Sequence, residues 1–343
     1  MGDGKLVISL DLELMWGVRD IRTVENYGRN ILGVHEVIPQ LLKVFETYKI
    51  KATFACVGFL FMETKAELIN NLPNNLPAYD DKQLSPYLGY FDSLGKDATE
   101  DLYHYAPRLI EQIRTYPAHE IGSHTFSHFY CLEKGQTITS FKEDIQAAKR
   151  AAGKYNINLT SLVLPRNQFN EDYLQVCVEE GILCIRGNEA SWLYKPRTEK
   201  KESLFRRAFR LIDAYVNISG HNCYNNDFLR KQIPINIPSS RFLRPFSKKL
   251  KSLDGLHLQR IKSGMKYAAK NDLTYHLWWH PHNFGINQQE NFLFLEKILE
   301  YYKELNRTYN FQSYTMTALA ETFLKTNNKN EYRTNKELSN KAT

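Results

Sequence analysis

Two kinds of apolar pattern alternate along the chain. Short continuous apolar runs are typical of strands buried on both faces of a parallel sheet. They cover residues 5–13, 51–58, 159–164, 182–185 and 275–282, and a shorter strand is expected at 119–122. Between these runs, apolar residues recur at helical spacing. The expected helices cover residues 30–48, 101–115, 139–154, 173–181 and 289–305. This alternation predicts βαβ units and therefore an α/β protein with a parallel sheet.

Three segments depart from the alternation. Residues 72–97 are rich in Asn, Pro, Asp and Tyr, which predicts an irregular insertion. Residues 195–270 form a basic insertion, and residues 326–343 are polar enough to be a disordered tail. A chain of 343 residues is long enough for one large α/β domain. We therefore expect residues 1–325 to be a single catalytic domain that contains both insertions.

The charge of the chain is concentrated in the basic insertion. Residues 195–270 contain 18 Lys and Arg against 5 Asp and Glu, whereas the rest of the chain has 27 against 33. A block of this kind usually marks an anionic partner such as a phosphate, a nucleic acid or a membrane surface. No recognised nucleic-acid-binding motif is present, so we expect no nucleic acid.

The basic insertion includes an amphipathic segment, residues 203–218, with Arg206, Arg207 and Arg210 on one face of the expected helix. Such a helix can lie on an anionic membrane; a surface helix with solvated arginines is the alternative. Residues 1–10 contain no basic segment followed by a long apolar run, so we expect no export signal, and no window is long and apolar enough for a membrane span. The five cysteines form no Cys-x-x-Cys pair. We expect a cytoplasmic protein, peripheral to the inner face of the membrane.

Candidate catalytic residues follow the first strand. Asp11 and Glu13 end its apolar run, and active sites of parallel α/β folds lie at the carboxyl ends of their strands. Trp16 follows and would place an aromatic side chain beside the two carboxylates. These residues predict the first part of a polar site.

A pair of histidines follows the strand at 119–122. In a helical turn, His124 and His128 would project from one face and reach a single divalent ion with their neutral nitrogens. The preceding Gly122 and Ser123 suit a sharp turn between strand and helix. Coincidental spacing is the alternative, because the chain has 10 histidines.

The order of these motifs resembles the NodB-homology polysaccharide deacetylases, carbohydrate esterase family 4, from about Val7 to Phe284. The resemblance implies a distorted (β/α) barrel, here with two insertions. It implies that Asp11 is the catalytic base and that Glu13, His124 and His128 bind a divalent metal, for which we expect zinc. The family usually has two adjacent aspartates, so here the second acid is displaced by one position and lengthened to Glu13.

Two further family motifs are present in altered form. Residues 164–168 correspond to Arg-x-Pro-Tyr, which implies that Arg166 orients the Asp11 carboxylate. The family's tyrosine is missing, so Asn167 or Gln168 would supply the backbone amide that holds the oxyanion. Residues 188–192 stand in place of Asp-x-x-Asp-Trp and retain only Trp192, which we expect to contact substrate.

The last strand resembles the family's Leu-x-His motif, which implies that His280 is the catalytic acid. His276 and His282 are its rivals, because residues two apart on a strand share a face. His282 is in any case expected near the substrate.

The resemblance implies removal of an acetyl or formyl group from the nitrogen of an amino sugar. The basic block favours a phosphate-linked substrate, such as a nucleotide-linked or lipid-carrier-linked intermediate of surface polysaccharide or lipopolysaccharide assembly. Two alternatives remain open: a hydrolase of a non-sugar C–N bond on the same fold, and a non-catalytic sugar-binding or membrane-associated scaffold.

Overall fold

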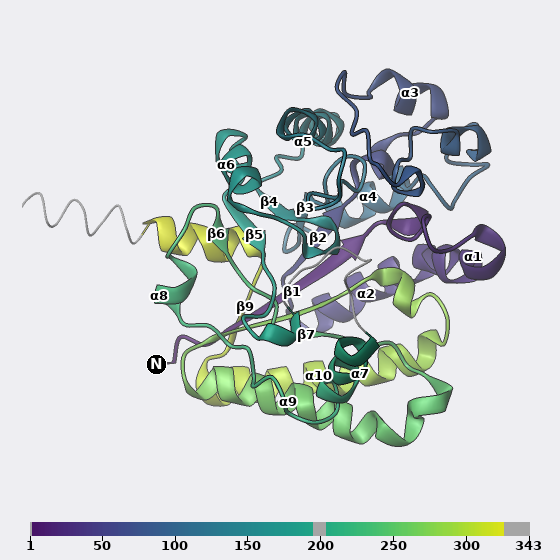
Figure 1. The fold of residues 1–343 in the computed structure, drawn as a ribbon. Coiled ribbons are helices and arrows are strands. Elements are labelled where there is room, and N and C mark those ends of the chain that lie inside the picture. The colour runs from purple at the N-terminus through teal and green to yellow at the C-terminus, as the bar shows by residue number, and fades with distance from the viewer. Residues whose placement is uncertain (1, 195–203, 326–343) are drawn as a thin grey trace, which may run out of the picture.

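A parallel sheet forms the centre of the computed structural model, which describes residues 2–194 and 204–325 (Figure 1). The strand order is β6-β5-β4-β3-β2-β1-β8-β7, and β9 pairs with β1. The strands are β1 (Lys5–Leu12), β2 (Ala52–Cys56), β3 (Glu120–Ser123), β4 (Ser161–Val163), β5 (Cys184–Arg186), β6 (Ile235–Asn236), β7 (Arg241–Phe242), β8 (Thr274–Trp279) and β9 (Gln312–Tyr314). Their order matches the predicted βαβ pattern.

The two ends of the strand order, β6 and β7, follow one another closely in sequence. Between them, the amide of Ser239 donates to the carbonyl oxygen of Gly187 at 2.9 Å, and the amide of Ser240 donates to that of His276 at 2.8 Å. Residues 237–240 thus connect the β5 side of the sheet to the β8 side, which closes the sheet into a ring. The predicted distorted (β/α) barrel is confirmed.

Helices surround the sheet (Figure 1). They are α1 (Val24–Leu32), α2 (Val34–Tyr48), α3 (Lys65–Asn70), α4 (Pro107–Arg114), α5 (Ile138–Gly153), α6 (Glu171–Glu179), α7 (Leu204–Asp213), α8 (Asn226–Leu229), α9 (Asp254–Lys270) and α10 (Gln288–Tyr309). The helix expected at 30–48 begins earlier and is divided at Gly33. A Cβ there would lie 2.1 Å from the carbonyl oxygen of Gly285, so only glycine fits this close approach.

The two-residue period of the strands separates the barrel interior from its outer wall. In β1, Leu6, Ile8 and Leu10 belong to the main hydrophobic core, which also contains side chains of α2, α9 and α10. The alternate residues Ser9 and Asp11 therefore face the interior. The strand that looks continuously apolar in sequence thus delivers its polar residues to one side.

A helix over residues 316–325, which the sequence analysis did not predict, fills one end of the barrel. Its apolar residues share a buried cluster with residues of five strands. The cluster includes Val7, Ala55, Val163, Cys184, Met316, Leu319, Ala320 and Phe323. Because Val7, Ala55 and Cys184 come before the last residues of their strands, the opposite end of the barrel is left for the polar residues.

The structure describes all of the predicted insertion at 72–97 but only part of the basic insertion. Within residues 72–97, the regular elements are two 3-10 turns, η3 (Lys82–Leu84) and η4 (Tyr90–Ser93). The predicted tail at 326–343 and residues 195–203 of the basic insertion lie outside the described residues. In the described part of the chain, no helix has the length and apolarity needed to cross a bilayer.

Candidate active site

Asp11, at the carboxyl end of β1, is paired with an arginine from β5. Arg186 donates to both carboxylate oxygens of Asp11, each at 2.6 Å, and both residues are buried. Burial alone raises the pKa of Asp11, but the charge and hydrogen bonds of Arg186 outweigh it and lower the pKa overall. Asp11 is therefore a fixed, ionised carboxylate.

The pairing of Asp11 with Arg186 corrects the expectation for Arg166. The guanidinium of Arg166 instead pairs with Asp20 and lies 4.4 Å from the ring centroid of Tyr130. Arg166 adopts a left-handed backbone conformation, with φ of 54°, in a turn after β4. Arg166 and Arg186 thus lie at the same mouth of the barrel. It is Arg186, at the end of β5, that reaches the Asp11 carboxylate.

Glu13 follows β1 and lies against a glycine. It precedes the 3-10 turn η1 (Leu14–Gly17), and a Cβ on Gly17 would lie 1.9 Å from the Glu13 carboxyl carbon. Burial alone raises the pKa of Glu13, but the charge of His280 and the contacts of His124 and His128 bring it well below the usual value. The turn therefore leaves space for an ionised side chain.

The helical turn predicted for His124 and His128 is wrong. Residues 124–130 form an irregular loop after β3, with Thr125 and His128 in the left-handed region at φ of 62° and 60°. Asp144 of α5 stabilises the loop by accepting hydrogen bonds from the amides of Phe126 and Ser127 at 2.6 and 3.2 Å. The loop nevertheless brings the two imidazoles together, with ring centroids 5.0 Å apart.

The two imidazoles aim their Nε2 atoms at one oxygen of Glu13. The distances to Glu13 Oε2 are 3.3 Å from His124 and 3.2 Å from His128. His124 Nδ1 lies 2.8 Å from the carbonyl oxygen of Val163, which can only accept, so Nδ1 carries the proton in this ring. In the neutral ring, Nε2 then presents a lone pair to a carboxylate oxygen.

A cation between these atoms would relieve the repulsion between their lone pairs. Burial lowers the pKa of His128 to about 4, which favours the neutral, ligand-competent ring. The three side chains can each offer one ligand atom, with all three atoms within 4.8 Å of one another. One carboxylate and two imidazoles fit a divalent metal, and the carbonyl partner of His124 is the kind that orients a metal ligand.

His280 lies on the other side of Glu13. Its Nε2 is 3.6 Å from Glu13 Oε1 and 3.7 Å from Asp11 Oδ2. Its side chain is 24% exposed, which leaves it in contact with the cavity. The ring of His282 stacks on it at a centroid distance of 4.9 Å and an angle of 3°.

The rivals of His280 have different surroundings. His276 is buried, with Nε2 2.8 Å from the Ser9 hydroxyl and Nδ1 2.9 Å from the carbonyl oxygen of Ile237. His282 is buried behind His280, and burial lowers its pKa to about 3. Glu13, His280 and His282 form a second possible ligand set, since they also offer atoms within 4.8 Å of one another.

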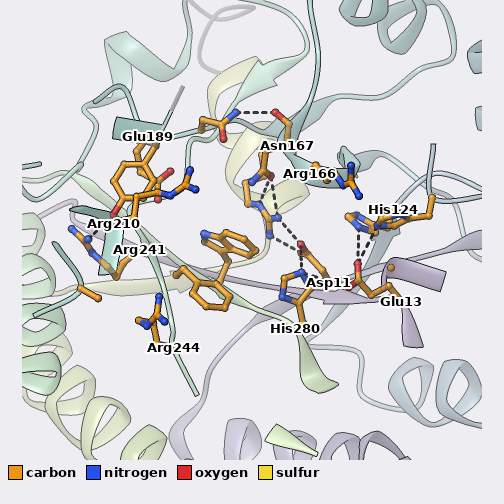
Figure 2. Close-up of a pocket in the computed structure, with 18 residues that line it drawn as sticks. Asp11, Glu13, His124, Arg166, Asn167, Glu189, Arg210, Arg241, Arg244 and His280 are labelled. Carbon is orange, nitrogen blue, oxygen red and sulfur yellow. Dashed lines mark hydrogen bonds and ion pairs between the residues drawn. The ribbon is translucent and has the colours of Figure 1, made fainter. Parts of the chain in front are cut away.

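Asp11, Glu13, His124 and His280 line one side of a cavity of about 400 Å³, whereas His276 and His282 do not line it (Figure 2). Figure 2 shows Asp11, Glu13 and His124 at one side and Arg210, Arg241 and Arg244 at the other. The complete lining is Asp11, Glu13, Gly17, His124, His128, Arg166, Asn167, Arg186, Asn188, Glu189, Tyr194, Arg210, Ala214, Arg241, Phe242, Arg244, Trp278 and His280. Five arginines and three carboxylates therefore line this space.

Asn167 has a different set of contacts from the one expected. The amides of Asn167 and Gln168 donate to carbonyl oxygens within their own turn, at 2.8 and 3.1 Å. The side-chain oxygen of Asn167 accepts from Arg186 at 3.2 Å, so Asn167 helps to position that guanidinium. The expectation that either amide is available for an oxyanion is therefore corrected.

The two tryptophans expected beside the site lie away from it. Trp16 is fully buried and donates through Nε1 to the carbonyl oxygen of His104 at 2.8 Å. Trp192 is 56% exposed, and neither ring lines the cavity. Trp278 and Phe242 do line the cavity, and the ring centroid of Trp278 lies 4.1 Å from the Arg186 guanidinium carbon.

The arginines of the basic insertion differ in how they are held. Arg241 is buried and donates to Asp213 at 2.5 Å. Burial alone raises the pKa of Asp213, but the charge and the hydrogen bond of Arg241 bring this pKa far below its usual value. Arg244 is partly exposed, and its guanidinium has no hydrogen-bond or ion-pair partner among the described residues. The guanidinium of Arg241 is therefore held in the cavity wall by its ion pair, whereas the N–H groups of the Arg244 guanidinium are available to bind a ligand.

Sequence reasoning missed Arg186 and the cavity role of Arg244. Arg186 carried one usable signal, because it lies at the end of an apolar strand run, as Asp11 does in β1. Choosing it over Arg166 required the barrel, in which β5 and β1 face each other across the interior.

Comparison with known proteins agrees with the fold and with the motifs. Residues 28–185 match the sequence profile of the polysaccharide deacetylase family. The matched part contains His124, His128 and Arg166, whereas Asp11, Glu13 and His280 lie outside it. No curated protein sequence matches the chain.

Solved structures resemble the fold at low sequence identity. A candidate polysaccharide deacetylase from Mycobacterium smegmatis is 12% identical with a TM-score of 0.59, over 95% of this chain and 92% of that one. A protein described as a probable polysaccharide deacetylase from Pseudomonas aeruginosa PAO1 is 11% identical with a TM-score of 0.54, over 94% and 91%. Puue allantoinase is 11% identical with a TM-score of 0.51, over 94% and 90%.

The predicted resemblance to the NodB-homology polysaccharide deacetylases, carbohydrate esterase family 4, is confirmed by this match and by the shared fold. Deacetylation, the reaction for which the family is named, is a hydrolysis.

Proposed function

We propose that this protein is a metal-dependent hydrolase that removes an acetyl or formyl group from the nitrogen of an amino sugar. The observation that carries the proposal is the grouping of three units at one mouth of the barrel. They are the Asp11–Arg186 pair, the cluster of Glu13 with two imidazoles, and His280, whose Nε2 lies within 3.7 Å of both carboxylates. A base, a ligand set and an acid are what hydrolysis of an amide requires.

Glu13, His124 and His128 would hold the divalent metal, for which zinc is our expectation from the ligand types. The chemistry that such a cation supplies when bound is activation of water and polarisation of a carbonyl. This ligand set leaves His280 and His282 outside it. His280 then remains available for proton transfer.

Asp11 would act as the general base. Each of its oxygens accepts one hydrogen bond from Arg186 and keeps a second lone pair, so the ionised carboxylate can still accept a proton from water. Arg186 and Asn167 act as positioning residues, because they hold the carboxylate toward the cavity.

His280 would act as the general acid. Water adds to the amide carbon, the C–N bond breaks, and the departing nitrogen takes a proton from His280. The products are a free amine on the sugar and acetate or formate. His280 has the position for this step, because its ring is partly exposed to the cavity and close to both carboxylates.

The substrate is proposed to carry phosphate. Guanidinium groups recognise phosphate oxygens with several donors, and the side of the cavity opposite Asp11 has Arg210, Arg241 and Arg244. A sugar joined through phosphate to a nucleotide or a lipid carrier has its anionic group a short distance from its N-acyl group. Such intermediates of surface polysaccharide or lipopolysaccharide assembly would place the enzyme in the cytoplasm.

The experiment that tests the proposal measures released acetate and formate. The purified protein, stripped with a chelator and reloaded with zinc, is given N-acetyl and N-formyl amino sugars, both free and as 1-phosphates. We expect release only after reloading, and faster release from the phosphates. Hydrolysis of cyclic amides with no reaction on sugars would instead support the non-sugar alternative, and no reaction on any substrate would support the scaffold.

A further inference from the structure

Helix α7 exposes apolar side chains and buries charged ones. Phe205, Ile212 and Val216 are 64%, 45% and 54% exposed, whereas Arg206 and Asp213 are buried. Positions 205, 212 and 216 are spaced by seven and four residues, so in and just beyond the helix they lie on one face. A surface helix of a globular protein normally has the opposite orientation.

The buried polar contacts fix this orientation. Arg206 donates to the carbonyl oxygens of Trp192 and Leu193 at 3.0 and 2.9 Å. Asp213 accepts from the hydroxyl of Tyr194 at 2.7 Å, in addition to its pairing with Arg241. Turning the helix to hide its apolar face would break these bonds inside the protein, so the exposure is built into the fold.

The exposed apolar face lies in the most basic part of the chain. Residues 204–251 contain ten Lys and Arg against two Asp and Glu. Arg207 is exposed on α7, and Lys248, Lys249 and Lys251 are exposed on the 3-10 helix η8 (Lys248–Leu253). That helix leads into α9.

Two contacts tie this region together. The ring of Tyr215, after α7, lies 5.7 Å from the ring of His257 in α9. Arg210 and Ala214, from another side of the same segment, line the active-site cavity. The apolar face, the exposed lysines and the cavity therefore belong to one region of the molecule.

We propose that the α7 face, defined by Phe205, Ile212 and Val216 with Arg207, docks on the surface of an anionic lipid bilayer. Apolar side chains enter the boundary between headgroups and acyl chains, while neighbouring cations attract anionic headgroups. A second copy of the chain is the less suitable occupant, because two such basic faces would repel each other. Docking would bring the cavity to lipid-linked sugars. This consequence for the substrate rests on the proposed function.

Vesicle flotation tests the docking. The full chain is mixed at low ionic strength with vesicles of phosphatidylcholine alone, or with roughly one third phosphatidylglycerol. The test variant combines Phe205→Ser, Ile212→Ser and Val216→Ser. The matched control combines Ile21→Ser and Leu88→Ser, which are 58% and 60% exposed outside this region.

We expect binding to the anionic vesicles that weakens at about 0.15 M salt, falls at least tenfold in the test variant and is unchanged in the control. Wild-type protein that stays unbound, or a test variant that binds as wild type does, would overturn the proposal. A wild-type dimer that dissociates in the test variant would also overturn it and would assign the face to a second copy.

A parallel assay separates this proposal from the proposed function. Acetate release from the water-soluble probe N-acetylglucosamine 1-phosphate needs no membrane, and the three substituted residues do not line the cavity. Loss of vesicle binding with turnover retained supports docking by α7. Vesicle binding without turnover in the wild type would support docking and refute the hydrolase.

Discussion

The position of the Glu13 carboxylate depends on the absence of a side chain at residue 17. A Cβ on Gly17 would lie 2.2 and 2.3 Å from the two carboxylate oxygens. Gly17→Ala should therefore displace Glu13 from the imidazoles and weaken zinc binding at least tenfold. Competition with a chromophoric chelator measures the affinity.

Gly255→Ala is the matched control for this prediction, because a Cβ at that position in α9 meets nothing within 4 Å. It should bind zinc as the wild type does. Equal zinc affinity in both variants would show that Glu13 is not a ligand or is not held by η1.

Arg186 controls the protonation of Asp11. In the wild type, the charge of Arg186 lowers the pKa of the carboxyl group below its usual value of 3.8 against the effect of burial. In Arg186→Gln, burial remains and the opposing charge is gone, so the pKa rises. The acidic limb of the pH dependence of kcat/KM should therefore move to higher pH.

The same substitution at Arg166 distinguishes the two arginines. Arg166 pairs with Asp20, so Arg166→Gln should leave the acidic limb where it is, even if it changes the rate. A shift in the Arg166 variant without one in the Arg186 variant would restore the role first expected from sequence.

At the scale of residues, the sequence was sufficient to identify candidate site residues that lie in short local motifs. Asp11, Glu13, His124 and His128 were chosen from short stretches, and the structure brings them together. Arg186 could not be preferred to Arg166 from sequence, because the pairing with Asp11 joins residues 175 positions apart. Trp16 was misplaced because an aromatic next to a site in sequence can turn into the core.

At the scale of elements, α5 determines the shape of the histidine loop. Asp144 is fully buried and accepts from Phe126, from Ser127 and from the Ser127 hydroxyl, the last at 2.5 Å. Asp144→Ala would leave two buried amides without partners. We expect the free energy of unfolding to fall by about 2–4 kcal/mol and zinc affinity to fall with it.

Asp172→Ala, at an exposed position in α6, controls for the loss of a carboxylate. Chemical denaturation should show a change of at most about 0.5 kcal/mol there. If both variants unfold alike, the histidine loop does not depend on Asp144.

Element prediction succeeded where apolar periodicity is strong. The strands β1, β2 and β8 and the helices α2, α5 and α10 all lie within or close to predicted ranges. The histidine segment was predicted as helical because spacing alone cannot reveal left-handed residues such as Thr125 and His128. The strands β6 and β7 have two residues each, too few for any period to show.

At the scale of the whole molecule, part of the excess positive charge of the basic insertion lies at the active-site cavity. The basic insertion contributes Arg241 and Arg244 to the cavity, on the side opposite Asp11. Arg244→Gln should raise KM for N-acetylglucosamine 1-phosphate about tenfold, leave kcat within about twofold, and leave KM for the unphosphorylated sugar unchanged.

Arg108→Gln, an exposed position on α4 away from the cavity, is the control for net charge. Steady-state kinetics of both variants at two salt concentrations provide the comparison. Equal changes for the phosphorylated and the free sugar would argue against an anion-binding role of Arg244.

The barrel was predictable from the order of strands, helices and family motifs, but its closure was not. Closure depends on residues 237–240, which join two sides of the sheet by hydrogen bonds to Gly187 and His276. The helix over 316–325 was missed because it is short and follows a long helix closely. Such features depend on contacts between distant segments.

The most direct test of the central claim compares acetate release by the zinc-loaded wild type and by Asp11→Asn, with N-acetylglucosamine 1-phosphate as the probe and zinc measured in both. The account predicts release by the wild type, release reduced by about 100- to 10,000-fold in the variant, as is typical when a general base is lost, and one zinc per chain in each. Equal release by the two proteins, or no release by a fully zinc-loaded wild type, would contradict it.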